Sequence, residues 1–179
     1  LAYGGGSICK NGIYDAVLAE LRKAGKQTVE LSGVMPNPTI EKVMEGVALA
    51  RKEAVDLILA VGGGSVCDYC KAVAGSAYCE QDPWKYYFNN FGEMTCRWIP
   101  VGCVLTMAGT GSEMDSCAVI SKHSENRKKF YYFRNPDFSI LNPAYTFTVP
   151  QYQTVAASTT SCRTSWSNTF RGRTTTRPT

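Results

Sequence analysis

Two glycine-rich segments carry the residue types that could do chemistry in this chain. The first, VGGGSVCDYCK at 61–71, follows an apolar run at 55–61 that predicts a buried parallel strand. Its consecutive glycines let the backbone turn sharply and approach a ligand with no Cβ in the way. The serine after them can cap the following helix, whose first N–H groups are free to bind a phosphate. We interpret the segment as a nucleotide pyrophosphate site, with an ordinary strand–helix turn as the alternative; its residues are Gly62, Gly63, Gly64 and Ser65.

The second segment, LTMAGTGSE at 105–113, supplies hydroxyl groups from another strand–loop edge. Thr106, Thr110 and Ser112 follow a predicted strand at 98–104. In open α/β sheets, ligands bind at the carboxyl ends of the strands. We therefore expect these hydroxyls to contribute to the same nucleotide site as the glycines.

The elements that must position these segments alternate along the chain. Predicted helices cover 11–24, 38–53 and 65–78; predicted strands cover 1–3, 27–31, 55–61, 98–104 and 138–141; and 119–121 with 129–133 suggest a hairpin. Alternation of this kind favours a Rossmann-like, doubly wound α/β fold with a mostly parallel sheet. Because the chain begins inside a predicted strand, we expect it to be a fragment.

Composition narrows the class of protein. The 179 residues suit one domain, and the net charge of +4 is mild. The basic residues are scattered apart from the short run 127–129, so we expect no nucleic-acid partner. No apolar run is long enough to span a bilayer and no signal peptide is recognisable, so we expect no membrane partner and a cytoplasmic location.

The eight cysteines and the single histidine do not form a catalytic pattern. Cys67 and Cys70 form a CxxC inside a predicted helix, but no second pair lies at zinc spacing. We interpret the cysteines as buried reduced thiols that pack as small apolar side chains. His123 lies in the polar stretch SKHSEN, which predicts a solvated loop residue.

Five motifs in order resemble the iron-containing alcohol dehydrogenases. GGGSVCDYCKAVA resembles their GGGSxxDxxK element, PVGCVLTMAGTGSEMDSCAVIS their second nucleotide loop, and PDFSILNPAYTFTVPQYQ the segment that leads into their metal site. YGGGSICKNGIYDAV and GVMPNPTIEKV point to the butanol-dehydrogenase-like branch. The resemblance covers residues 3–153. It implies hydride transfer between a small alcohol or aldehyde and NADP or NAD, with iron or zinc in a second, all-helical domain that this chain lacks, and a homodimer for the full-length parent.

The resemblance also implies further cofactor residues. The threonines lie near the adenosine and ribose, and Lys128 contacts a ribose hydroxyl, with Lys129 as a competing choice. We expect the turn at Gly4 to favour NADP, because an acidic residue there would repel a 2′-phosphate; a plain turn with no influence on the choice of cofactor is the alternative. Two alternatives stay open, namely a non-catalytic nucleotide-binding domain and a related glycerol, polyol-phosphate or dehydroquinate-synthase-like enzyme. The implied residues are Gly4, Gly5, Ser7, Asn37, Asp68, Thr106, Thr110, Val119 and Lys128.

The C-terminal stretch differs in composition from the rest. We predict a nucleotide-binding domain at 1–158 and an aberrant, disordered tail at 159–179, which is composed mainly of Ser, Thr and Arg and contains one Trp. The resemblance would place the metal-binding Asp and His where Thr160 and Thr164 stand. Reading one base earlier can give Asp-Ile-Met-Ser-His-Val-Leu-Glu-Gln-Tyr-Phe, so we hypothesise a frameshift, with coincidence as the alternative. As written, the chain is expected to bind no catalytic metal and to lack dehydrogenase activity.

Overall fold

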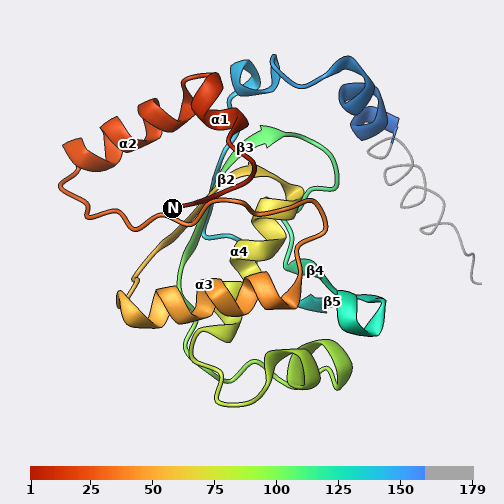
Figure 1. Cartoon of the computed structure of the whole chain (residues 1–179). Coiled ribbons are helices and arrows are strands. Elements are labelled where there is room, and N and C mark those ends of the chain that lie inside the picture. The colour runs from red at the N-terminus through yellow and green to blue at the C-terminus, as the bar shows by residue number, and fades with distance from the viewer. Residues whose placement is uncertain (160–179) are drawn as a thin grey trace, which may run out of the picture.

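A parallel sheet forms the centre of the structure, a computed structural model that describes residues 1–159 (Figure 1). Its strands lie in the order β1-β2-β3-β6, and each neighbouring pair is parallel. A separate antiparallel hairpin follows β3 in the chain. The strands are β1 (Ala2–Tyr3), β2 (Ile58–Gly63), β3 (Val101–Met107) and β6 (Phe138–Ile140), and the hairpin is β4 (Cys117–Lys122) with β5 (Arg127–Tyr132).

Helices cover both faces of this sheet. One face packs against α1 (Ser7–Lys10) and α2 (Ile13–Lys23), and the other against α3 (Ile40–Lys52) and α4 (Gly64–Ser76). The strands alternate between the two cores, as the period of two in a β-strand requires. Leu59, Val61 and Val104 contribute to the α1–α2 side, while Ala60, Cys103 and Leu105 contribute to the α3–α4 side. The predicted doubly wound α/β fold is therefore confirmed.

Shorter helices complete the fold. A π-helix at Trp84–Asn89 buries Trp84, Tyr87 and Phe88, and 3₁₀ turns lie at His123–Glu125 and Pro143–Thr146. Residues 151–159 are helical. The prediction from sequence contained none of these elements. The part of the prediction that concerns the tail beyond residue 159, including the positions Thr160 and Thr164, lies outside the described residues.

Two predicted elements differ from the observed ones. The helix expected at 11–24 is present as α2 but begins two residues later, because Gly12 at its N-cap takes a left-handed φ of 76°, and the short helix α1 before it was not predicted. The strand expected at 27–31 was wrong: only Leu31 forms a bridge, to Ala2. Its hydrogen bonds run to Leu1 and Tyr3, with N···O distances of 2.9 and 3.1 Å. The terminal amino group of Leu1 also donates to the Val29 carbonyl at 2.8 Å, so this stretch runs beside β1 without forming a regular strand.

The described cysteines are all free thiols, and only some of them are buried as predicted. Cys67, Cys70, Cys79 and Cys103 are buried, whereas Cys9 is exposed on the short helix α1. The expectation of uniformly buried thiols is thus corrected at Cys9. His123 is exposed, as predicted. In the part of the chain that the structure describes, no helix is both long and apolar enough to cross a membrane.

Candidate functional site

The glycine turn lies between the carboxyl end of β2 and the first turn of α4. Gly63 is the N-cap of α4 in an extended conformation, and no side chain makes a capping hydrogen bond there. Ser65 lies inside the first turn, so the prediction that its side chain caps the helix was wrong. The first N–H groups of an α-helix have no partner within the helix. At the uncapped N-terminus of α4, these N–H groups can therefore donate hydrogen bonds to an anion.

The hydroxyl loop, residues 106–112, lies directly beside this helix end. Thr110 Oγ1 and Ser112 Oγ are 3.1 Å apart. A Cβ added to Gly64 would lie 3.1 Å from the former and 3.3 Å from the latter. The structure thus brings the two sequence motifs together, and the glycine at 64 is what allows the hydroxyls to approach the backbone.

A register shift helps to place this loop. Gly62 pairs with Leu105 and Gly63 pairs with Met107, so Thr106 is the extra residue of a β-bulge. Bulges bend a strand and redirect side chains, and they are common next to binding sites. The bulge ends the regular pairing of β2 and β3 where the predicted nucleotide site begins.

The remaining glycines differ in how much space surrounds them. A Cβ on Gly62 would lie 2.5 Å from Val66 Cγ2, so packing alone requires glycine at this position. A Cβ on Gly63 would make ordinary contacts with Met107, the nearest at 3.5 Å. Packing inside the protein therefore does not require glycine at 63, and close approach of a ligand to this position stays a prediction.

Asp68 and Val119, both predicted cofactor residues, meet at the junction of α4 and β4. The carboxylate is buried, and its Oδ2 accepts a hydrogen bond from the Val119 N–H at 3.0 Å. Burial raises the pKa of Asp68, and the nearby Lys71 charge and the Val119 N–H oppose that rise. These contacts give Asp68 a structural role, and contact of either residue with the cofactor stays a prediction.

Lys71 is the residue that sequence reasoning missed. Its side chain is fully buried. Nζ donates to the carbonyl of Ser112 at 2.9 Å, to the carbonyl and Oδ1 of Asp115 at 3.1 and 2.9 Å, and to the carbonyl of Cys117. The available signal was a lysine among the small and apolar residues that follow the glycines. A lysine is almost never fully buried unless it is paired.

Asn37 and Lys128 are far apart in the sequence and adjacent in the structure. Lys128 Nζ donates to Asn37 Oδ1 at 2.6 Å. Lys129 lies on the opposite face of β5 and donates to Asn89 Oδ1 at 2.6 Å. Val119 lies on the Lys128 face, because cross-strand partners share a face and Val119 pairs with Phe130 while Ser121 pairs with Lys128. This arrangement favours Lys128 over Lys129 as the lysine predicted to contact a ribose hydroxyl.

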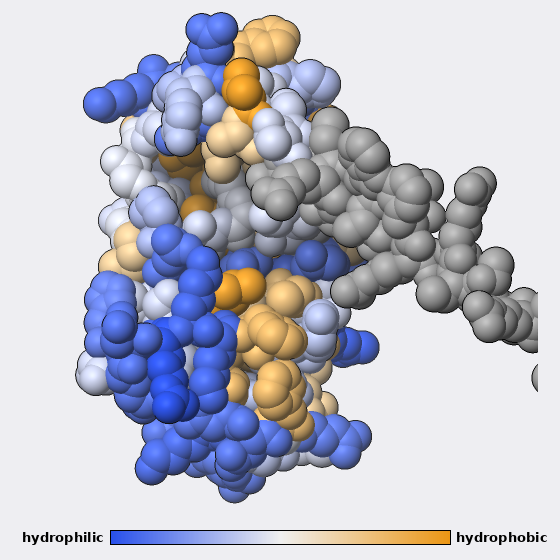
Figure 2. Space-filling view, turned by 90° about the vertical axis from the view of Figure 1, so that its right-hand side faces the viewer, coloured by the Kyte–Doolittle hydropathy of each residue, from blue (hydrophilic) through white to orange (hydrophobic). Residues whose placement is uncertain are grey.

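The hairpin also presents aromatic side chains to solvent. Phe91, Phe130 and Tyr132 are exposed, and their rings form a chain of contacts with centroids 5.8 and 5.5 Å apart. Figure 2, which views the molecule from the right-hand side of Figure 1, shows apolar surface beside strongly hydrophilic surface. This side of the hairpin therefore offers both cationic and apolar contacts.

The residues Gly4, Gly5 and Ser7 lie next to the glycine turn of β2. Tyr3 of β1 pairs in parallel with Val61 of β2, so the chain leaves both strands at the same edge of the sheet. Gly5 and Ser7 are exposed. The structure therefore places this turn where an extended ligand on α4 could reach it.

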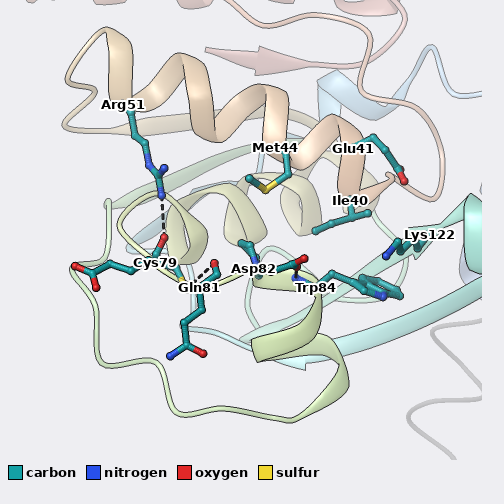
Figure 3. A pocket seen from close by; sticks show the side chains of 11 residues that line it. Ile40, Glu41, Met44, Arg51, Cys79, Gln81, Asp82, Trp84 and Lys122 are labelled. Atoms are coloured by element: carbon teal, nitrogen blue, oxygen red, sulfur yellow. Dashed lines mark hydrogen bonds between the residues drawn. The ribbon is translucent and has the colours of Figure 1, made fainter.

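Two pockets lie at different distances from the predicted cofactor residues. The larger, about 660 Å³, lies between α3 and residues 79–84 and contains none of them (Figure 3). Arg51 crosses its rim and donates to the Cys79 carbonyl at 2.9 Å. A smaller pocket of about 360 Å³ is lined by Met107, Ala108 and residues of 146–158. Because Met107 also faces Gly63, this smaller pocket borders the glycine turn.

Metal ligands are not gathered in the described part of the chain. Among residues 1–159, no three His, Cys, Asp or Glu side chains converge as a metal site. The site at the end of β2 presents backbone N–H groups and hydroxyls, which are groups that can bind a phosphate.

Comparisons with known proteins identify relatives that match most of this chain. NADH-dependent butanol dehydrogenase A of Clostridium acetobutylicum is 44% identical over 160 residues, which are 88% of this chain and 41% of that protein. NADPH-dependent aldehyde reductase YqhD of Escherichia coli is 42% identical over 157 residues, which are 86% of this chain and 40% of that protein. The crystal structure of NADH-dependent butanol dehydrogenase A from Thermotoga maritima superposes with a TM-score of 0.85 at 42% identity, covering 90% of this chain and 41% of that one.

These matches define both the family and the extent of the chain. The chain spans about 40% of the length of the relatives it matches. The family model for iron-containing alcohol dehydrogenase matches residues 1–143, the whole sheet and all of its covering helices. The chain therefore belongs to the iron-containing alcohol dehydrogenase family.

Proposed function

We propose that this chain is the cofactor-binding part of a metal-dependent NAD(P)(H) alcohol dehydrogenase or aldehyde reductase. One observation carries the proposal: the uncapped start of α4 lies beside the Thr110–Ser112 hydroxyl pair, with Gly64 between them. The cofactor pyrophosphate is an anion of suitable chemistry for such a surface. The names of the relatives, which include NADH-dependent and NADPH-dependent enzymes, support the choice of cofactor.

The residues present fit a dinucleotide. The N–H groups of Gly64 and Ser65 would hold the pyrophosphate, the threonine hydroxyls would lie beside it, and Lys128 would reach a ribose hydroxyl. When bound, the nicotinamide ring supplies the hydride chemistry. The protein's contribution is to bind the phosphates, to fix their direction along the sheet edge, and to keep Cβ atoms out of their path.

The residues present do not fit a catalytic metal. Among residues 1–159 no metal-ligand cluster exists, so no step of the reaction is assigned to a metal in this chain. We propose that the iron or zinc, and the alcohol or aldehyde substrate, belong to the longer parent protein. A homodimer, a cytoplasmic location and the lack of nucleic-acid or membrane partners stay predictions that rest on the resemblance and on composition.

Titration of the purified chain with NADPH and NADH tests the proposal. We expect saturable binding of at least one cofactor, followed by nicotinamide fluorescence. In a parallel assay with added iron or zinc, butanol and NADP, we expect no turnover. Absence of binding for both cofactors would contradict the cofactor-binding role. Stoichiometric bound metal with turnover would contradict the restriction to that role.

A further inference from the structure

Lys71 is a buried cation that the proposed function leaves without a role. Its side chain is 0% exposed. All four acceptors of its Nζ belong to residues 112–117, which comprise the end of the β3–β4 connection and the first residue of β4: they are three carbonyls and the Asp115 carboxylate. Hydrogen bonds from a charged group are roughly twice as strong as neutral ones. Lys71 therefore holds this segment against α4 more firmly than packing alone would.

Ser112 links Lys71 to the helix start. Its carbonyl accepts from Lys71, and its hydroxyl lies 3.1 Å from Thr110 Oγ1 and beside Gly64. Residues seven apart lie on one face of an α-helix. Gly64 and Lys71 thus present one face of α4 to the loop, with the glycine allowing approach and the lysine holding it in place.

Asp68 connects this contact to the helix itself. Its Oδ1 lies 3.6 Å from Lys71 Nζ and has no hydrogen bond among the described residues. Its Oδ2 accepts from Val119 N–H on β4. The carboxylate is buried, so the neighbouring positive charge offsets the free energy of its desolvation. Lys71 and Asp68 together join α4 to both ends of the 112–119 segment.

We propose that Lys71 is a positioning residue for the cofactor pyrophosphate. It holds the Thr110 and Ser112 hydroxyls against Gly64, so that the phosphate meets the helix N–H groups and the hydroxyls together. The ligand in this proposal rests on the proposed function, whereas the positioning of the loop is a property of the chain by itself. Lys71 touches no reacting atom and acts through Ser112.

Two variants test the proposal. Lys71→Met removes the ammonium and keeps an apolar stem, and Asp115→Ala removes one acceptor whose side chain is 46% exposed. Lys129→Met is the matched control, because that lysine donates to Asn89 on the other face of β5. Each protein is titrated with ADP, the simplest pyrophosphate ligand of the site, and its amide hydrogen exchange is measured without ligand.

Lys71→Met should weaken ADP binding by about tenfold and speed up exchange at residues 110–117. Asp115→Ala should weaken ADP binding by about threefold, and it decides the matter if Lys71→Met does not fold. Lys129→Met should change neither quantity.

The possible failures can be distinguished. If the wild type binds ADP and the folded Lys71→Met variant binds it equally well with unchanged exchange, the positioning role is wrong. If Lys71→Met does not fold and Asp115→Ala matches the wild type in both measurements, the role is also wrong. If the wild type does not bind ADP while exchange at 110–117 rises in the variants, the proposed function fails and the positioning of the loop stands.

Discussion

Residues 4–7 and 62–65 are the same tetrapeptide, GGGS, and the structure uses them differently. Each lies at the end of a parallel strand and leads into a helix at the same edge of the sheet. The first follows a strand of 2 residues and leads into a helix of 4, whereas the second begins within the last two residues of a strand of 6 and leads into a helix of 13. Gly5 and Gly6 have no atom within 4 Å of an added Cβ, while Gly62 and Gly64 are in close contact.

We infer from this difference that the surroundings of a glycine turn, and not its glycines alone, determine whether it can bind a ligand. In the first turn, glycine is needed for the backbone conformation, because Gly6 has a left-handed φ of 91°. In the second, glycine lets side chains of another loop approach the helix start. Only the second turn combines a long helix, whose N–H groups all point one way, with neighbouring hydroxyls. We therefore expect the second GGGS to dominate affinity and the first to modulate it.

The largest effect on stability should come from Gly62→Ala. The new Cβ would lie 2.5 Å from Val66 Cγ2 and 2.9 Å from Val66 Cβ, and valine cannot turn freely to avoid it. Overpacking of this kind costs about 1–3 kcal/mol of unfolding free energy. Chemical denaturation measures it, with Gly62→Ala/Val66→Ala as the control that restores the space. Equal stability of Gly62→Ala and the wild type would show that the close contact is not real.

Gly63→Ala should leave the fold intact and weaken cofactor binding. Its Cβ would meet Met107 at 3.5 Å, an ordinary contact, so the loss reports on the ligand. We expect about a tenfold higher dissociation constant, because the added carbon blocks close approach of the phosphates. Gly5→Ala, at the exposed turn, should change it by less than about threefold. A larger loss in Gly5→Ala than in Gly63→Ala would reverse the comparison between the two turns.

Only part of the fold and site could be predicted from the sequence. The apolar run before Gly62 and the alternation of helices and strands were sufficient for the doubly wound sheet. The π-helix at Trp84–Asn89 was not predicted, because its aromatic side chains are ordered by tertiary packing against the hairpin. Strand limits shifted for a similar reason: β2 extends into Gly62 and Gly63 because β3 pairs with them.

In the site, too, local features could be predicted and tertiary contacts could not. The backbone turn was predicted from GGGS, since consecutive glycines indicate a turn directly in the sequence. The partners of Lys71 were not visible, because they lie 41 to 46 residues away and meet it only after β3 and β4 are in place. The helix cap was predicted at Ser65 from residue type, whereas the N-cap of α4 lies two residues earlier, at Gly63.

The preference for NADPH or NADH tests what the first turn, residues 4–7, contributes to cofactor binding. We expect NADPH to bind more tightly than NADH, because no acidic side chain follows β1 at Gly4. Gly5→Asp should weaken NADPH more than NADH, since its carboxylate would repel the 2′-phosphate and the position has open space. Gly5→Asn is the uncharged control. Tighter binding of NADH by the wild type would refute the preference.

The smallest effect on cofactor binding should come from the neighbouring lysines of β5, and it should differ between the two. Lys128→Ala should weaken cofactor binding by about threefold, because Lys128 lies on the Val119 face and bonds to Asn37. Lys129→Ala should leave it unchanged, since its partner is Asn89 on the other side. A loss in Lys129→Ala alone would move the assignment by one residue.

The most direct test of the central claim is an amide NMR titration of the chain with ADP. The account predicts saturable shifts concentrated at Gly63, Gly64, Ser65, Thr110 and Ser112, since these groups form the surface at the start of α4. Shifts at Gly5 and Ser7 should be smaller. Saturating ADP that leaves the amides at 63–65 unshifted, or that shifts the pocket between α3 and residues 79–84 instead, would contradict the account.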